Sequence, residues 1–186
     1  SAAVVMDVNN GDILALASAP TFDPNKFING ISVADWKALN ENDYRPLANK
    51  TVQGAYPPGS TFKMVVALAA LTLGVTNIQE EVNCPGHKDI NGRKFHCWRR
   101  GGHGKVNLRK ALRYSCDVYF YEMSLRVGIE KITETANALG LGIKHDLPLP
   151  AIHSGLMPTK KWKQRNKKED WYIGDTANAG IGQGFV

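Results

Sequence analysis

Residues 62–73 constrain the fold of this chain more than any other stretch. They combine strong helix formers with apolar side chains on most faces, and a helix that is apolar nearly all round is a buried one. The longest apolar run, residues 64–71, lies inside this stretch and has only eight residues, whereas a membrane-spanning helix needs roughly 20. The stretch therefore predicts a core helix and no membrane span.

The composition is typical of a globular protein. The chain has 186 residues, of which 43% are hydrophobic and 22% charged, which excludes wholesale disorder and allows a sizeable core. The length suits one compact domain, or one domain with a fragment of another. The sequence starts without a signal peptide, so we expect it to be an excised part of a longer protein.

The net charge is +6, and basic residues gather in two stretches, 93–113 and 160–168. Such clusters can bind nucleic acid. No nucleic-acid motif accompanies them, and aromatic residues are not interleaved as stacking platforms would require. We therefore expect no nucleic-acid partner, and the charge favours a solvated surface near acidic polymers or anionic lipid.

Local signals predict a mixed α/β chain. A turn at residues 9–12 separates apolar runs at 4–6 and 13–17, and Asn-Gly between such runs indicates a hairpin. Residues 82–105 are Gly-rich with little periodicity and predict a long functional loop. Residues 147–158 predict a further loop, 159–172 are basic and weakly patterned, and 178–186 are Gly-rich. Helices are expected over residues 33–39, 62–73, 107–114, 118–126 and 129–139.

Ser60 and Lys63 form the first candidate site. Ser60 follows a rigid Pro-Pro-Gly and enters the predicted core helix, and positions i and i+3 share a helix face, so Lys63 can reach its hydroxyl. The helix dipole and burial both disfavour an ammonium there, which leaves Lys63 suited to act as a base for a serine nucleophile. The alternative is a Ser60 that merely caps the helix.

A second polar element, Ser115-Cys116-Asp117, follows about 55 residues later at a break between two predicted helices. It can face the same cleft as Ser60. The alternative is a simple helix junction that is capped by Asp117.

The cysteines form another constellation. Cys84, Cys97, His103 and Cys116 are separated by twelve, five and twelve residues, and Cys₃His is a common structural zinc set. A metal would stabilise the Gly-rich segment, which has few apolar residues to order it. Two alternatives stay open, a Cys84–Cys97 disulfide with a buried Cys116, or three unrelated thiols. Rival ligands within the segment are His87, Asp89 and His96.

Several segments together resemble one family. The motif S-x-x-K occurs with S-D-N and K-T-G in β-lactamases and penicillin-binding proteins. Residues 53–63 (QGAYPPGSTFK) resemble the nucleophile segment of class B penicillin-binding proteins. Their first transpeptidase strands are similar to residues 3–7 (AVVMD), 11–16 (GDILAL) and 19–25 (APTFDPN), and residues 180–184 (GIGQG) resemble the segment before their third motif. The Ser-x-Asp form and Gly102-His103-Gly104 are most similar to the penicillin-binding protein 2 subfamily.

The resemblance implies a D,D-transpeptidase that crosslinks peptidoglycan stem peptides and is acylated by β-lactam antibiotics. It makes Ser60 the nucleophile and Lys63 its base. Ser115 would relay protons to the leaving amine, and Asp117 stands where other members carry Asn. K-T-G, which binds the substrate carboxylate and completes the oxyanion hole, is absent from this sequence. We therefore expect little or no turnover from these residues alone.

The fold implied is part of a penicillin-binding-protein transpeptidase or β-lactamase-like domain, mainly its helical part with N-terminal sheet strands. Residues 1–186 would be the N-terminal part of that domain, with 82–105 a zinc-binding insertion. The membrane anchor, the non-catalytic pedestal domain and the C-terminal strands would lie outside it. The resemblance also implies a periplasmic location on the bacterial inner membrane, with a glycan polymerase and elongation-complex proteins as partners.

Two other functions stay open from the sequence. One is a class D-like β-lactamase or a β-lactam sensor, although the residues around Ser60 argue against it. The other is a non-catalytic, zinc-stabilised module that docks onto cell-wall proteins. If zinc binds, ligation by Cys116 would pin the second motif to the Gly-rich segment, without an open position for a catalytic water.

Overall fold

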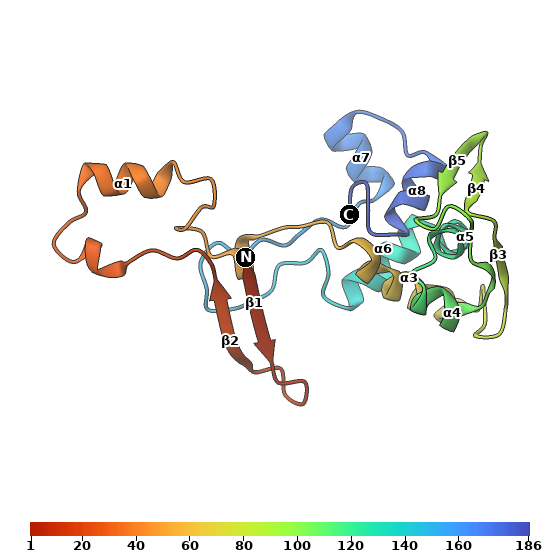
Figure 1. The fold of residues 1–186 in the computed structure, drawn as a ribbon, viewed down its shortest axis with the longest axis horizontal. Helices are drawn as coiled ribbons and strands as arrows, with labels where there is room; N and C mark the ends of the chain where they lie inside the picture. Colours follow the sequence, from red (N-terminus) through yellow and green to blue (C-terminus); the bar gives the residue numbers. More distant parts are fainter. The chain divides into compact units, whose positions relative to one another are not determined.

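The computed structural model describes all 186 residues, Ser1–Val186. The chain divides into two compact units, each described below by itself. Unit 1 comprises Ser1–Ala55 and Lys144–His153, and unit 2 comprises Tyr56–Ile143 and Ser154–Val186. Helices and short two-stranded sheets make up the chain (Figure 1). The expected mixed α/β class is confirmed.

Unit 1 contains the predicted hairpin. β1 (Ala2–Met6) and β2 (Ile13–Ser18) pair antiparallel. Gly11 adopts a φ of +84° in the connecting turn, which few residues other than glycine tolerate. The unit also contains α1 (Val33–Asn40), whose cap Ser32 accepts the Asp35 N–H, and a short α2 (Lys50–Gln53) that packs on the hairpin. The hairpin and the helix at 33–39 are confirmed, whereas α2 was not expected.

Unit 1 has almost no buried side chains. Pro46 is its one buried residue, and every residue of β1 is exposed. Val4, Val5 and Met6 keep 48%, 52% and 53% of their surface accessible. The elements of this unit therefore form through turns, caps and strand pairing, and not around an apolar core.

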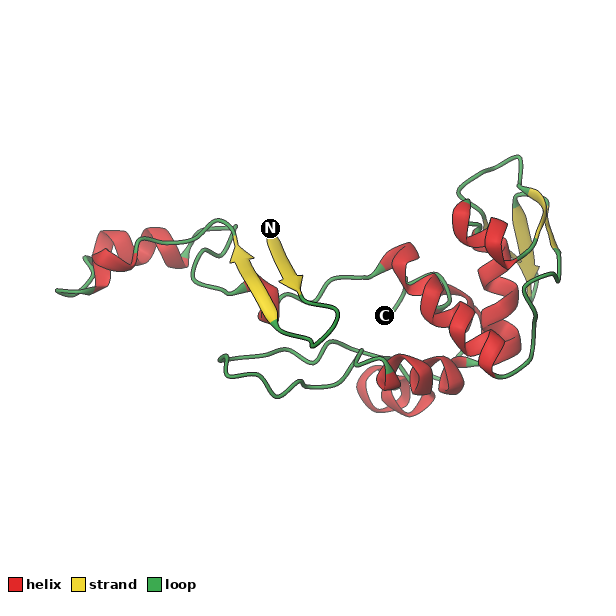
Figure 2. Ribbon diagram, turned by 90° about the horizontal axis from the view of Figure 1, so that it is seen from below, coloured by secondary structure: helices red, strands yellow, loops and turns green.

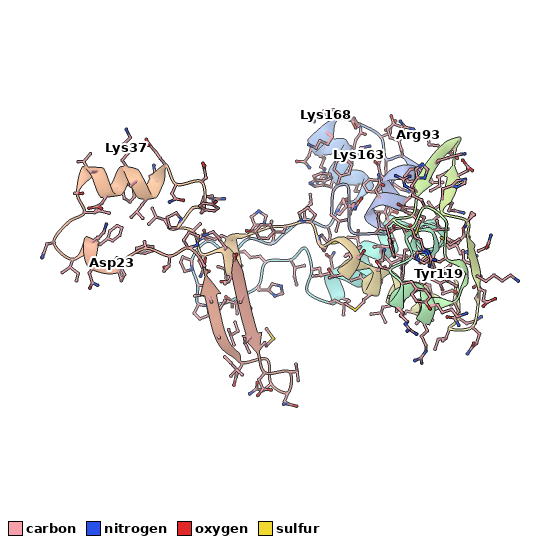
Figure 3. The ribbon with its side chains drawn as sticks, viewed as in Figure 1. Asp23, Lys37, Arg93, Tyr119, Lys163 and Lys168 are labelled. Atoms are coloured by element: carbon pink, nitrogen blue, oxygen red, sulfur yellow. The ribbon has the colours of Figure 1, made fainter.

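Unit 2 is built around one central helix, α5 (Asp117–Val127). α3 (Lys63–Thr72), α6 (Ile129–Ala138) and α8 (Ile173–Ala179) all pack on it, together with α4 (Leu108–Arg113) (Figures 1 and 2). Tyr119, labelled in Figure 3, is fully buried on α5, as are Phe120 and Met123. The buried core cluster of the chain lies entirely in this unit.

The predicted core helix at residues 62–73 is present as α3, but only part of it is buried. Val66, Ala69 and Ala70 have no exposed surface, whereas Met64 and Leu68 are 65% and 43% exposed. The small alanines allow α3 to approach α5 and α6 closely. The helix was expected to be buried nearly all round, but only one face of α3 is buried. No helix is long and apolar enough to span a bilayer.

The Gly-rich segment is not a loop. β3 (Val82–Cys84) pairs with β6 (Gly104–Val106), and β4 (His87–Ile90) pairs with β5 (Arg93–His96). Strands of three or four residues are too short to show an alternating pattern. The sequence therefore gives no periodic signal for these two small sheets.

Two helices near the end were also not expected. α7 (Lys160–Lys167) begins at Thr159, whose hydroxyl accepts the Trp162 N–H. Its Lys163, labelled in Figure 3, is buried. Lys163 donates to Asp175 of α8 at 2.7 Å, so a polar pair joins the two helices. Lysine is usually a surface residue, so a buried lysine gives no apolar signal in the sequence. Residues 160–167 therefore lack the apolar periodicity that predicts a helix.

Candidate active site and metal centre

A short 3₁₀ turn, Gly59–Phe62, holds Ser60 directly before α3. Gly59 has a φ of +56°, and its N–H donates to the Gly182 carbonyl at 3.0 Å. A side chain at Gly182 would overlap the backbone of Gly59. The segment after α8 thus fixes the turn that presents Ser60. Ser60 does not cap α3, because no side chain caps the start of that helix.

Ser115 lies in the junction between α4 and α5, in an unusual backbone conformation. Its φ is +50°, which is uncommon for a residue other than glycine. Its hydroxyl donates to Ser60 Oγ at 2.9 Å. Two hydroxyls that are 55 residues apart in the sequence therefore meet in space, as the candidate site requires.

Lys63 is 1% exposed and points at the second motif. Its Nζ donates to Ser115 Oγ and to the Ser115 carbonyl, both at 2.9 Å, and to Asp117 Oδ1 at 2.6 Å. Ser60 is not among its hydrogen-bond acceptors. Lys63 therefore reaches Ser60 through the hydroxyl of Ser115, and not by the direct contact that their spacing suggested.

Asp117 supplies the negative charge that a buried ammonium needs. It is 8% exposed and begins α5, where the helix dipole stabilises an anion. One carboxylate oxygen accepts from Lys63 and the other accepts the Trp98 N–H at 2.8 Å. Asp117 thus does not cap the junction, since both its oxygens are used by other elements.

The two hydroxyls open into a pocket of about 530 Å³. The Tyr121 ring lines it, and its hydroxyl donates to the His96 carbonyl at 3.2 Å. Burial, followed by the nearby Asp117 charge, raises the pKa of Tyr121, so this phenol stays neutral. The lining comprises Ser60, His96, Cys97, Trp98, Arg100, Ser115, Asp117, Tyr121, Ile181 and Gln183.

The second constellation also comes together. Cys84, Cys97, His103 and Cys116 place one ligand atom each within 4.8 Å of one another. His103 Nδ1 lies 3.6 Å from the sulfurs of Cys84 and Cys97. All three cysteines are buried and free, so the structure does not contain the alternative Cys84–Cys97 disulfide. The rival ligands His87, Asp89 and His96 all lie outside this group. His87 Nε2 is 3.6 Å from Asp89 Oδ2.

The chemistry of these four residues fits a soft metal ion. Burial raises the pKa of the Cys116 thiol, so a thiolate at this position needs a neighbouring cation. Burial, and next the charge of Arg99, lower the pKa of His103, which keeps its imidazole neutral. His103 Nε2 is buried without a hydrogen-bond partner while Nδ1 faces the sulfurs. Three sulfurs and one imidazole nitrogen are a set that suits zinc.

Comparison with known proteins places this chain in a family. Residues 1–185 match the penicillin binding protein transpeptidase domain. The chain belongs to this family. It is 40% identical to the peptidoglycan D,D-transpeptidase MrdA of Acinetobacter baumannii, over 98% of this chain and 28% of that protein. The Escherichia coli K12 MrdA is also 40% identical, over all of this chain and 30% of the relative.

Solved structures of penicillin-binding proteins agree with the sequence match. The crystal structure of Pseudomonas aeruginosa PBP2 in complex with WCK 5153 matches with a TM-score of 0.95 and 38% identity, covering 100% of this chain and 41% of that one. The Helicobacter pylori PBP2 complex with MreC matches with a TM-score of 0.94 and 38% identity, covering 99% and 34%. The chain thus spans about 30% of the length of the curated relatives it matches.

Within this penicillin-binding protein domain, two residues at the site were missed by sequence reasoning. Trp98 contacts both Ser115 and Asp117, but no motif spacing connects it to them. Gly182 contacts Gly59, and its only signal was its place in the segment 180–184. The contacts of both residues depend on tertiary packing, which short motifs do not encode.

Proposed function

We propose that this chain is the part of a peptidoglycan D,D-transpeptidase that carries the nucleophile, with Ser60 as the acylated residue. The observation that carries the proposal is the continuous hydrogen-bonded chain Ser60–Ser115–Lys63–Asp117. A serine hydroxyl needs a nearby base to become a nucleophile, and this chain leads from Ser60 to a buried lysine. The family of the chain and its MrdA relatives support the same activity.

The proposed reaction proceeds in two acyl transfers. Ser60 Oγ attacks the carbonyl carbon of the penultimate D-Ala of a stem peptide. Its proton passes through the Ser115 hydroxyl to Lys63, which accepts it as a neutral amine, and the ammonium that forms pairs with Asp117. Collapse of the intermediate breaks the peptide bond, and terminal D-Ala leaves after its amine takes a proton back through Ser115. An amine of a neighbouring stem peptide then attacks the ester carbonyl carbon and loses a proton through Ser115 to Lys63. The ester C–O bond breaks as Ser60 Oγ takes that proton back, which completes the crosslink and frees Ser60.

Stabilisation of the oxyanion needs more than these residues. The backbone N–H of Ser60 would supply one donor, and the family's third motif would supply the other. We propose that residues 1–186 are the N-terminal part of the transpeptidase domain, with little turnover alone. The exposed apolar residues of β1 support further strands on this sheet, since an isolated two-stranded hairpin is marginally stable.

We also propose a structural zinc ion on Cys84, Cys97, His103 and Cys116. Such an ion would hold the segments that carry its ligands together. It would take no part in the reaction, because four protein ligands leave no open coordination position. Cys116 lies between Ser115 and Asp117, so its ligation would tie the second motif to β3 and to the turn after β5. The Gly-rich residues 82–105 would then act as a zinc-binding insertion that orders the site.

The proposed partners follow from the family. They are peptidoglycan stem peptides, β-lactam antibiotics, a glycan polymerase and elongation-complex proteins, in the periplasm on the inner membrane. Two structural relatives support these partners. One is PBP2 with MreC from Helicobacter pylori, and the other, with a TM-score of 0.84 and 34% identity, is a peptidoglycan synthase complex that coordinates polymerization and crosslinking.

The test uses the complete transpeptidase domain and a stem pentapeptide that ends in D-Ala-D-Ala. We expect release of free D-Ala and a crosslinked dimer, and loss of both with Ser60→Ala. Rapid hydrolysis of a β-lactam without a dimer would indicate a β-lactamase. A folded, metal-containing domain with an unreactive Ser60 would indicate a non-catalytic module, and either result would overturn the proposal.

A further inference from the structure

Trp98 is the one tryptophan that touches the candidate site, and its placement is unusual. It follows Cys97 in the turn after β5, and 63% of its surface is exposed. An exposed indole gains little from apolar burial. Its position therefore has another cause, and the hydrogen bonds of its side chain and backbone supply one.

The indole N–H of Trp98 points at the junction that carries Ser115. It donates to the Tyr114 carbonyl at 3.0 Å and to the Ser115 carbonyl at 3.1 Å. Ser115 holds a φ of +50°, a conformation that persists only where the surroundings fix it. The indole thus bonds both peptide carbonyls at the point where the backbone is strained.

The same carbonyl is shared with the lysine. Ser115 O accepts from Lys63 Nζ at 2.9 Å as well as from the indole. The backbone N–H of Trp98 donates to Asp117 Oδ2, while the other oxygen of Asp117 accepts from Lys63. Trp98 therefore bonds one of the three oxygens that accept from the Lys63 amine, and through Asp117 Oδ2 it also holds the carboxylate that carries a second.

We infer that Trp98 is a positioning residue for the acylation step, in that its indole N–H fixes the Ser115 backbone and so aligns the Lys63 amine with the two hydroxyls. This inference rests on the proposed function of Ser60. Trp98 acts through Ser115 and Asp117 and takes no part in proton transfer. Its ring also contacts the His103 ring edge-on, with ring centroids 5.3 Å apart. This contact helps to orient the indole so that its N–H points at the Ser115 junction.

The test is the kinetics of acylation by benzylpenicillin in the complete domain, separated into the dissociation constant of the first complex and the rate constant of the covalent step. Trp98→Phe removes the indole N–H and keeps an aromatic ring. A matched control is Trp171→Phe, because Trp171 donates its indole N–H to Thr176 Oγ1 at 2.8 Å, away from the pocket. Benzothienylalanine at position 98 replaces only the indole N–H by sulfur. This variant tests the same hydrogen bonds if W98F does not fold.

We expect W98F and the benzothienyl variant to lower the covalent rate constant about tenfold, the scale of one hydrogen bond that fixes a reacting geometry. The dissociation constant should stay within about twofold, and W171F should acylate like the parent. Covalent rate constants within twofold of the parent in both Trp98 variants, or a change in the dissociation constant alone, would overturn the inference and leave Ser60 as nucleophile. A parent domain that is not acylated at Ser60 would overturn the proposed function as well.

Discussion

The two units of this chain differ in what holds them together. Unit 2 contains the whole buried core cluster and all eight candidate site residues, whereas unit 1 has a single buried residue, Pro46. In unit 1 the hairpin depends on local contacts, such as the Asp7 N–H that donates to the Asp12 carbonyl at 2.8 Å. Packing around α5 therefore holds the site, and the strands that resemble the sheet of the family do not.

A second comparison lies within unit 2, between two buried lysine–aspartate pairs. Lys63–Asp117 at 2.6 Å belongs to the site, and Lys163–Asp175 at 2.7 Å joins α7 to α8. The lysine side chains are 2% and 3% exposed. The two pairs are therefore similar in geometry and burial, and only Lys63–Asp117 contacts Ser115 and, through its hydroxyl, Ser60.

The largest expected effect comes from breaking these pairs separately. Asp117→Asn should slow acylation of the complete domain by about 100-fold or more, because Lys63 loses its counter-charge and its orientation. It should also destabilise the domain by about 3–5 kcal/mol, the cost of an uncompensated buried charge. Acylation by benzylpenicillin and thermal unfolding measure the two effects.

Asp175→Asn is the matched control, since it also leaves a buried lysine without its nearest carboxylate. It should lower the unfolding temperature but keep acylation within about threefold of the parent. Equal losses of acylation in both variants would show that the acylation rate depends only on the stability of unit 2. Asp117 would then have no special role in the reaction.

Metal removal should affect the two units differently, and this is the next largest effect that we expect. One zinc ion per chain is expected by native mass spectrometry of the chain as purified, and a chelator should free three thiols. Amide exchange should then rise in residues 82–105 and stay unchanged in β1 and β2, because all four proposed ligands lie in unit 2. Cys116→Ser should give the same pattern. A chain two hydrogens light without metal would instead mean a disulfide.

A smaller effect is expected at Gly182, which has a φ of +70°. Gly182→Ala adds a side chain that overlaps Gly59, so the turn that presents Ser60 must shift and acylation should fall about tenfold. Gly74→Ala is the control, because Gly74 has a φ of +65° and open space around it. It should cost about 1 kcal/mol of stability and leave acylation unchanged; equal acylation rates in both would contradict the assigned role of Gly182.

The smallest effect concerns the acid stability of unit 2. Hydrogen bonds from Arg126 and then Thr76 lower the pKa of Glu80. Burial acts against it, but hydrogen bonds from Lys88 and Arg126 hold the pKa of Glu122 below its usual range. Because both pKa values are lower in the folded state, their stabilisation is present above about pH 4.5, the ordinary value for Glu, and is lost as the pH falls through the folded values.

Arg126→Met should therefore lower the stability of the domain at neutral pH slightly and flatten its decline below pH 4.5. Unfolding midpoints at a series of pH values test this. An unchanged acid decline in the variant would show that other carboxylates dominate it.

The sequence predicted the elements that local chemistry specifies. The turn containing Gly11 and the Asn107 cap, whose side chain accepts the Lys110 N–H at 3.0 Å, depend on neighbouring residues only. The four metal-ligand candidates could be grouped because all three cysteines of the chain lie close in the sequence. The pairing of the Ser60 and Ser115 segments came from the family's motifs, since no local signal connects residues 55 positions apart.

What the sequence did not predict depends on tertiary contacts. β3 and β6 pair across the Gly-rich residues 85–103 without an alternating pattern, and α7 is joined to α8 by the buried Lys163. Trp98 reaches Ser115 and Asp117 only because the turn after β5 packs on the start of α5. Each of these contacts requires the folded unit, and none has a fixed spacing along the chain.

The site of acylation tests the proposed role of Ser60 most directly. The complete domain would be treated with benzylpenicillin, its intact mass measured, and the labelled peptide sequenced by mass spectrometry. We expect one penicilloyl group per chain on the peptide that contains Ser60, and none in Ser60→Ala. An adduct on Ser115, or an adduct that persists in Ser60→Ala, would contradict this role.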